Sequence, residues 1–246
     1  MKKQIVMFSG GASSSYLAYL VAKEYGKENT ILLHTPTYAE DPDADRFRTE
    51  VAEFLGLPIT VEEDGRDLWK CIEDNKCLPS FHIPFCTTEL KIKQSRKFFR
   101  NLENRGIDFV AHFGYGADEW RRVQKQSVRL EVEGIKSKYL NFERKIADKE
   151  IKRIIQEEWR IELPRTYKYL KHNNCIPCFK GGKGHFKQVA KYYPNEFNKA
   201  MKLEEKIGHT VFKDCTLQDI WKEVQSTKNQ VTFFDDMYGI PCMCMD

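Results

Sequence analysis

The chain has 246 residues, of which 41% are hydrophobic and 31% are charged, a composition typical of a soluble globular protein. This length suffices for one large α/β domain, or for one domain with a small addition. No apolar run approaches the length of a membrane span, and residues 1–4 lead into a strand rather than a signal sequence. We therefore expect a cytoplasmic protein that contacts no membrane.

Strands and helices are predicted to alternate in the first part of the chain. The apolar patterns place strands at residues 5–8, 30–34 and 58–61 and helices at residues 16–25 and 44–55. Such alternation implies right-handed crossovers and predicts a Rossmann-like α/β fold with a mostly parallel sheet flanked by helices. Ligands of these sheets bind at the carboxyl ends of the strands.

The second part of the chain is predicted to hold fewer strands. We expect an irregular segment at 64–85, a basic helix at 87–105, a strand at 109–113 followed by a glycine loop at 114–122, and helices at 148–159, at 194–207 and from 216. We place a domain boundary after Leu163, which gives a nucleotide-binding domain at 1–163 and a basic, helical, cysteine-containing region at 164–246. Between residues 163 and 195 the chain has seven basic residues and no acidic one, although its net charge is only +4.

The turn after the first strand carries the sequence Ser9-Gly10-Gly11-Ala12-Ser13-Ser14. Glycines at a strand-to-helix turn let the backbone approach a ligand, and the free N–H groups of the helix start favour an anion. The turn lacks the Gly-Lys-Ser/Thr ending of a Walker loop and the G-x-G-x-x-G dinucleotide pattern. It resembles the phosphate loop of the PP-loop ATP pyrophosphatases. The alternative is a glycine turn with a serine-rich helix start.

Eight cysteines are many for a cytoplasmic chain, in which disulfides are rarely kept. Cys175 and Cys178 have the C-x-x-C spacing that lets two thiolates reach one metal ion or cluster. Further ligands would come from Cys86, Cys242 and Cys244, with Cys71, Cys77 and Cys215 as weaker candidates. Spacing alone does not choose between zinc and iron–sulfur. A redox dithiol and inert buried cysteines are the alternatives.

Four motifs in this order resemble the phosphoadenosine-phosphosulfate (PAPS) reductase family of the adenine nucleotide alpha-hydrolase superfamily. They are the loop at 9–14, Cys86-Thr87-Thr88-Glu89-Leu90-Lys91, Gly114-Tyr115-Gly116-Ala117-Asp118-Glu119, and Cys175-Ile176-Pro177-Cys178. The match spans residues 4–208, which is most of the chain.

The resemblance implies roles for individual residues. The nucleotide would be held by the loop, by the end of the second strand and by the second glycine loop, that is, by Ser9, Gly10, Gly11, Ser13, Ser14, His34, Thr35, Gly114 and Arg122. Cys86, Cys175 and Cys178 match the cysteines that hold a [4Fe-4S] cluster in some members. Glu119 matches an acidic residue of the family and is a candidate catalytic residue, with magnesium as an additional cofactor.

The chain also departs from the family pattern. Gly116 stands where the family usually has arginine, His34 replaces an aspartate, and Cys86 lacks an adjacent cysteine. The Gly10-Gly11 pair is as in enzymes that split ATP. The tail contains Cys242 and Cys244 but not the Glu-Cys-Gly context of the reductase nucleophile.

Three functions are compatible with these motifs. The first is ATP-dependent sulfur transfer, which forms AMP and pyrophosphate and uses an iron–sulfur cluster, with a nucleotide or a nucleic acid such as tRNA or DNA as the acceptor. The second is reduction of an adenosine phosphosulfate with Cys242 or Cys244 as nucleophile. The third is a zinc-stabilised, non-catalytic module that binds nucleotides or nucleic acids. A protein that donates sulfur or electrons and a second copy of the chain are further expected partners.

A basic, aromatic-rich segment favours the nucleic-acid acceptor, because phosphates and bases bind such side chains. It contains Tyr167, Tyr169, Phe179, Lys180, Lys183, His185, Phe186 and Lys187. The alternative is a solvated basic face beside a thiolate cluster.

Overall fold

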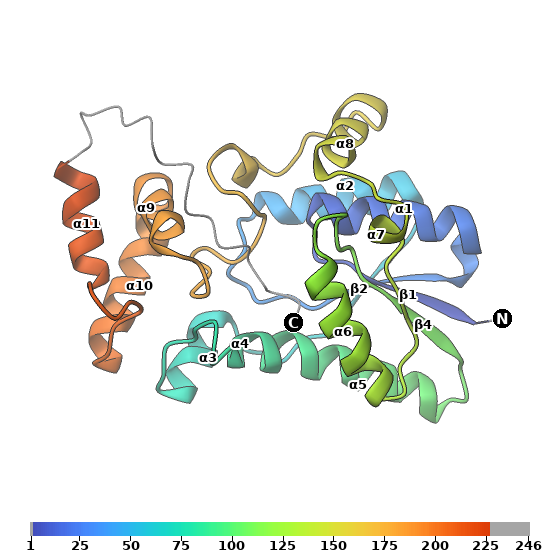
Figure 1. Ribbon diagram of the computed structural model, residues 1–246, viewed down its shortest axis with the longest axis horizontal. Coiled ribbons are helices and arrows are strands. Elements are labelled where there is room, and N and C mark those ends of the chain that lie inside the picture. Colours follow the sequence, from blue (N-terminus) through green and yellow to red (C-terminus); the bar gives the residue numbers. More distant parts are fainter. Residues whose placement is uncertain (1, 227–246) are drawn as a thin grey trace.

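The structure is a computed structural model in which residues 2–226 are described (Figure 1). Its centre is a five-stranded sheet with the order β3-β2-β1-β4-β5, and every pair of neighbouring strands is parallel. The strands are β1 (Lys3–Met7), β2 (Thr30–His34), β3 (Ile59–Val61), β4 (Phe109–His112) and β5 (Ser137–Lys138). The predicted α/β fold with a parallel sheet is confirmed.

The strand order reverses between β1 and β4. The chain first moves outward from β1 through β2 to β3, and then crosses back to pair β4 with the other side of β1. In open parallel sheets a crevice forms at the carboxyl ends of the two strands where the order reverses, and ligands bind there. The loops that follow β1 and β4 therefore define the expected binding position.

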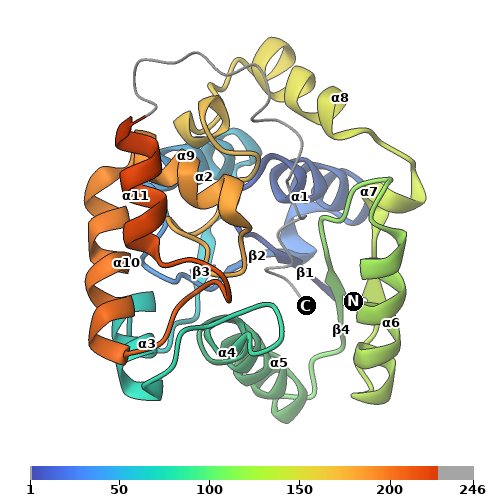
Figure 2. The ribbon, with the colours of Figure 1, turned by 60° about the vertical axis from the view of Figure 1, so that its left-hand side comes forward.

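Helices cover both faces of the sheet (Figures 1 and 2). Val6 and Leu32 point to one face and pack with α1 (Ala12–Tyr25) and α2 (Asp43–Leu55). Ile5 and Leu33 point to the other face and pack with α5 (Lys93–Asn104) and α6 (Trp120–Val132). This alternation is the period of two that extended strands impose, and it explains why both faces of the sheet are apolar.

Some predicted elements were wrong or incomplete. The segment 64–85 is not wholly irregular, because α3 (Leu68–Asn75) begins after Asp67, whose carboxylate accepts a hydrogen bond from the Lys70 N–H. Two helices were missed, α6 and α9 (Lys183–Tyr192). Both begin close to glycines that suggested loops, and burial of one helical face overrides that local signal.

Strand β5 and a short helix, α7 (Leu140–Glu143), were also not predicted. The remaining helices lie close to their predicted positions. They are α4 (Phe85–Thr87), which continues through a π-helical turn (Thr88–Ile92) into α5, α8 (Asp148–Arg153) with a π-helical turn (Ile154–Glu158), α10 (Pro194–Ile207) and α11 (Leu217–Ser226). Short 3-10 turns lie at Lys27–Asn29 and Arg165–Lys168. Among the helices of residues 2–226, none combines the length and the apolar character needed to cross a membrane.

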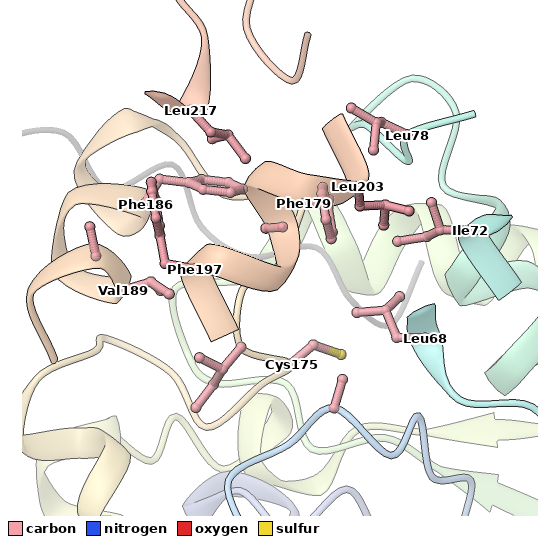
Figure 3. Close-up of a cluster of buried hydrophobic side chains, with 14 of the residues drawn as sticks. Leu68, Ile72, Leu78, Cys175, Phe179, Phe186, Val189, Phe197, Leu203 and Leu217 are labelled. Atoms are coloured by element: carbon pink, nitrogen blue, oxygen red, sulfur yellow. The ribbon is translucent and has the colours of Figure 1, made fainter. Parts of the chain in front are cut away.

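The C-terminal helices share a core with the first half of the chain. Phe186, Phe197 and Leu217 pack in the same buried cluster as Leu68 and Ile72 of α3 (Figure 3). The boundary at residue 163 stays a prediction. The shared core ties α9, α10 and α11 to α3 at one side of the sheet.

Candidate functional site

The two glycine loops meet at the point where the strand order reverses. The first follows β1 and contains Gly10 with φ +82°, a conformation that glycine adopts without strain. The second begins at Gly114 after β4. A Cβ atom at Gly114 would lie 3.0 Å from the backbone N and Cα of Ser14. The close approach of the two backbones therefore favours glycine at this position, because any Cβ atom would have to push the Ser14 backbone aside.

The serines of the first loop hold its shape. The Ser14 hydroxyl donates to the Gly11 carbonyl over 2.9 Å and lies 3.2 Å from the Ser9 hydroxyl. The Ser13 hydroxyl donates to the Asp148 carboxylate over 3.4 Å. Because α1 begins at Ala12, the first N–H groups of this helix have no partner within the helix and face the crevice side of the sheet. The loop thus has the form of an anion cradle.

Arg48 places a buried positive charge behind the loop. Its guanidinium donates to the Ser9 carbonyl over 3.3 Å and pairs with Asp45, and its side chain packs against Gly10. Burial and this nearby charge lower the pKa of His34 to about 4, so the imidazole is neutral at pH 7. His34 Nδ1 donates to the Phe8 carbonyl over 3.0 Å.

Three neighbouring cavities line the carboxyl edge of the sheet. The first is lined by Ser9, His34 and Thr35 among others. The second lies between Thr35 and the two arginines Arg96 and Arg129. The third is the cavity of the cysteines. Lys91 lines all three, so they adjoin one another at this side chain.

The cysteine cavity brings together Cys86, Cys175 and Cys178, which come from two segments about ninety positions apart. The sulfur of Cys175 lies 3.1 Å from the Thr37 hydroxyl. Figure 3 shows this sulfur directed toward α3, on the side of Leu68, which also lines the cavity. The peptide bond between Ile176 and Pro177 is cis.

Lysines and a histidine surround the three cysteines. Lys180 is buried, lines the cavity, and donates to the Thr87 hydroxyl over 3.1 Å. The Cys178 N–H donates to His185 Nε2 over 3.0 Å. Clustered thiolates carry negative charge, and the ammonium groups of Lys91 and Lys180 offset that charge in a partly desolvated position.

The arrangement of the donors bears on which metal group fits. Within residues 2–226, no three His, Cys, Asp or Glu side chains converge closely enough to hold a single metal ion. The three cysteines instead surround a common cavity. A structural zinc ion requires four ligands at about 2.0–2.3 Å from one point, whereas an iron–sulfur cluster is held by thiolates spread around it. The structure brings the three predicted cysteines to one cavity, and the choice between a cluster and a zinc ion stays a prediction.

A buried ion pair lies between the cavities. The Lys91 ammonium is 4.0 Å from the Glu40 carboxylate, which also accepts a hydrogen bond from Thr37 over 2.7 Å. Burial raises the pKa of Glu40, but the charge of Lys91 and the hydrogen bond from Thr37 outweigh it and hold that pKa below its ordinary value. Glu40 is therefore ionised and fixes Lys91 in place.

The second glycine loop is held by its own acidic residue. Glu119 accepts a hydrogen bond from the Gly116 N–H over 2.6 Å and pairs with Arg122. The guanidinium of Arg122 lies 4.6 Å from the centre of the Tyr115 ring. The catalytic role of Glu119 and the nucleotide role of Arg122 stay predictions. The other predicted catalytic residues, Cys242 and Cys244, lie outside the described residues.

The structure adds residues that the sequence did not single out. Arg48 lies on the helix predicted at 44–55 from its apolar residues, and no role was predicted for it. Lys91 was one of several lysines on the basic helix predicted at 87–105. A signal for Lys91 was its position five residues after Cys86. In the basic, aromatic-rich segment, Phe179 and Phe186 belong to the core. Two of its lysines are paired with acids, Lys183 with Asp214 and Lys187 with Glu223.

No protein-family model and no curated protein matches the chain. Among solved structures it is similar to the U34-tRNA thiolase NcsA from Methanococcus maripaludis with its [4Fe-4S] cluster. The two are 16% identical, the similarity covers 97% of this chain and 76% of that one, and the TM-score is 0.47. The fold assignment rests on the sheet topology, and the site rests on the residues described above.

Proposed function

We propose that the chain is a PP-loop nucleotide enzyme that splits ATP into AMP and pyrophosphate and transfers sulfur to the activated acceptor. The observation that carries this proposal is the adjacency of two sites. A glycine loop at the reversal of strand order leads through cavities that share Lys91 to a cavity lined by three cysteines. Nucleotide activation and sulfur chemistry need this neighbourhood, because a reactive adenylate must meet its nucleophile before water does.

The loop supplies what pyrophosphate departure requires. In the first half of the reaction an acceptor oxygen attacks the α-phosphorus, the bond to the β-phosphate oxygen breaks, and pyrophosphate leaves with its electrons. Backbone N–H groups at the start of α1 and the fixed charges of Arg48 and Lys91 stabilise that leaving group. His34, neutral at pH 7, borders the same cavity and adds no charge.

The cysteine cavity supplies the position for a sulfur source. Cys86, Cys175 and Cys178 would hold an iron–sulfur cluster, which contributes a soft sulfur donor when it is bound. Lys180 and Lys91 offset the thiolate charge. In the second half of the reaction sulfur replaces the activated oxygen and AMP leaves with that oxygen.

The acceptor is expected to be a nucleic acid, either tRNA or DNA. The support is the excess of basic residues between 163 and 195. Tyr169 and Tyr192 add a partly exposed pair of rings whose centres are 4.1 Å apart at an interplanar angle of 19°. Lys191 lies over the Tyr192 ring, 5.2 Å from its centre. Exposed aromatic rings beside lysines are typical of surfaces on which bases stack.

The test begins with anaerobic purification of the full chain, followed by analysis of iron, sulfide and zinc. The protein is then incubated with ATP, a sulfide source and either tRNA or DNA. We expect iron with matching acid-labile sulfide, and AMP and pyrophosphate whose formation depends on one acceptor. Sulfite release from an adenosine phosphosulfate, without ATP cleavage, would support the reductase alternative. Colourless protein with one zinc ion and no turnover would support the non-catalytic alternative.

A further inference from the structure

The hydroxyl of Tyr167 lies against the phosphate loop and contacts one of its backbone N–H groups. Its hydroxyl accepts a hydrogen bond from the Ala12 N–H over 3.1 Å. Ala12 is the first residue of α1, so this N–H is among those that an anion at the helix start would use. A Cβ atom at Gly11 would lie 3.5 Å from the same hydroxyl oxygen, which places the oxygen directly against the loop.

A second contact joins the same segment to the loop. The Asn173 side-chain amide donates to the Gly10 carbonyl over 2.8 Å, and its oxygen accepts from the Thr166 hydroxyl over 2.8 Å. Thr166 and Asn173 are both buried. Residues 166–173 therefore hold the loop at Gly10 and at Ala12, and the chain enters the cysteine cavity two residues later at Cys175.

The contact at Ala12 is of a kind that a phosphate can replace. Burial raises the pKa of Tyr167 to about 12, so its hydroxyl is neutral at pH 7. A neutral hydroxyl is a weaker acceptor than a phosphate oxygen, whose hydrogen bonds to N–H groups are charge-assisted. The Lys152 ammonium lies 4.5 Å from the centre of the Tyr167 ring and pairs with Asp148 over 2.7 Å, so the ring has a cation on one face whose charge Asp148 balances.

We propose that Tyr167 is a positioning residue of the nucleotide site: its hydroxyl takes the place of a phosphate oxygen, and the nucleotide displaces it. Displacement loosens residues 166–173, and because these lead directly to Cys175, filling the phosphate loop changes the cysteine cavity. This inference rests on the proposed nucleotide binding. The phosphate loop and the cysteine cavity are then thermodynamically coupled: a ligand bound at one changes the affinity of the other for its own ligand, and the factor is the same in both directions.

The first experiment compares ATP binding to the wild-type chain, to Tyr167→Phe and to Tyr19→Phe by calorimetry. Tyr167→Phe removes the competing hydroxyl and keeps the ring. Because a hydrogen bond of this kind contributes about 0.5–1.5 kcal/mol, we expect ATP to bind about two- to tenfold more tightly. Tyr19→Phe is the matched control, because the Tyr19 ring packs against Trp159 with 5.5 Å between the ring centres and lines none of the three cavities. Its affinity should equal that of the wild type.

Two results would count against the proposal in distinguishable ways. If the wild type binds ATP and Tyr167→Phe binds it equally or more weakly, the displacement inference fails and the nucleotide site stands. If neither protein binds ATP or pyrophosphate, the proposed function fails and the inference fails with it.

The second experiment measures amide hydrogen exchange of the full chain with and without pyrophosphate. In the wild type we expect pyrophosphate to protect residues 10–15 and to speed exchange in residues 166–173. The Leu170 N–H, which donates to the Thr166 carbonyl over 2.7 Å, is a reporter within this segment. In Tyr167→Phe the segment should exchange faster from the start and respond less. Protection of the loop with no change in residues 166–173 would overturn the coupling.

Discussion

The phosphate loop and the cysteine cavity adjoin each other but are built in different ways. The loop is local: Ser9, Gly11 and Ser14 bond one another within six positions. The cavity is formed by residues far apart in the sequence, because Cys86 precedes α5 and Cys175 follows the last strand, β5. The loop keeps much of its shape through its own hydrogen bonds, to which residues 166–173 add contacts at Gly10 and Ala12, whereas the cavity depends wholly on the packing that brings two segments together.

The largest expected effect is the loss of bound iron when a cysteine of the cavity is replaced while the phosphate loop is left unchanged. Cys175→Ser removes a thiolate from the cavity and leaves the hydrogen bonds of the loop intact, so we expect loss of most of the bound iron with ATP binding retained. Iron and sulfide analysis and ATP calorimetry on the same sample measure both. Cys215→Ser is the control, because Cys215 packs at the edge of the C-terminal core and does not line the cavity. Full iron content in Cys175→Ser would remove this residue from the ligand set.

A core substitution tests whether the cavity depends on distant packing. Phe186 is fully buried between Phe197 and Phe212 and lies beside His185, which accepts the hydrogen bond from the Cys178 N–H. Phe186→Ala leaves a cavity that costs about 3–5 kcal/mol of unfolding free energy. Chemical denaturation gives this value. We expect iron content to fall with stability, and an unchanged denaturation midpoint would contradict the shared core.

The contrast between the local loop and the cavity formed by distant segments also explains how much of each could be predicted from the sequence. The glycine loop, the strand at 30–34 and the helix at 194–207 were predicted because spacing and glycine carry local information. Cys175 and Cys178 were proposed from their C-x-x-C spacing with Cys86 as a further ligand, and the family resemblance selected the same three. That they line a common cavity depends on the tertiary structure and could not be predicted from spacing. Arg48, Lys91 and Tyr167 were not assigned to the site for the same reason. Their contacts are with residues distant in the chain, so no local pattern pointed to them, apart from the position of Lys91 five residues after Cys86.

Two buried histidines at the ends of β2 and β4 provide a pH test of the carboxyl edge of the sheet. Burial lowers the pKa of His34 and of His112 to about 4, against about 6.5 in an unfolded chain. Between these values the unfolded chain binds more protons, so stability falls as the pH drops from about 6.5 to 4. Each histidine accounts for a loss of up to about 3 kcal/mol.

The measurement is denaturation at several pH values between 4 and 7. In His112→Gln we expect about half of the wild-type loss over this window, because only His34 still titrates there with a strongly lowered pKa. His112 Nε2 lies 2.8 Å from the Gln4 side-chain oxygen, so glutamine keeps a donor near that partner. An identical pH slope in the variant and the wild type would show that His112 is not buried in its neutral form.

The smallest expected effect on stability comes from Gly114→Ala in the second glycine loop, for which Gly116→Ala in the same loop is the control. Of the two substitutions, only Gly114→Ala should also weaken ATP binding. A Cβ atom at Gly114 meets the Ser14 backbone at 3.0 Å, whereas at Gly116 the nearest atom is a Glu119 carboxylate oxygen at 3.6 Å, an ordinary contact. Gly114→Ala should cost about 1–3 kcal/mol through overpacking. It should also weaken ATP binding, because the loop must shift away from its anion-binding shape. Gly116→Ala should change neither. The clash at Gly114 involves the phosphate loop and no cysteine, so iron content should be equal in the two variants. A selective loss of iron in Gly114→Ala would mean that the cysteine cavity depends on the phosphate loop as well as on its own packing.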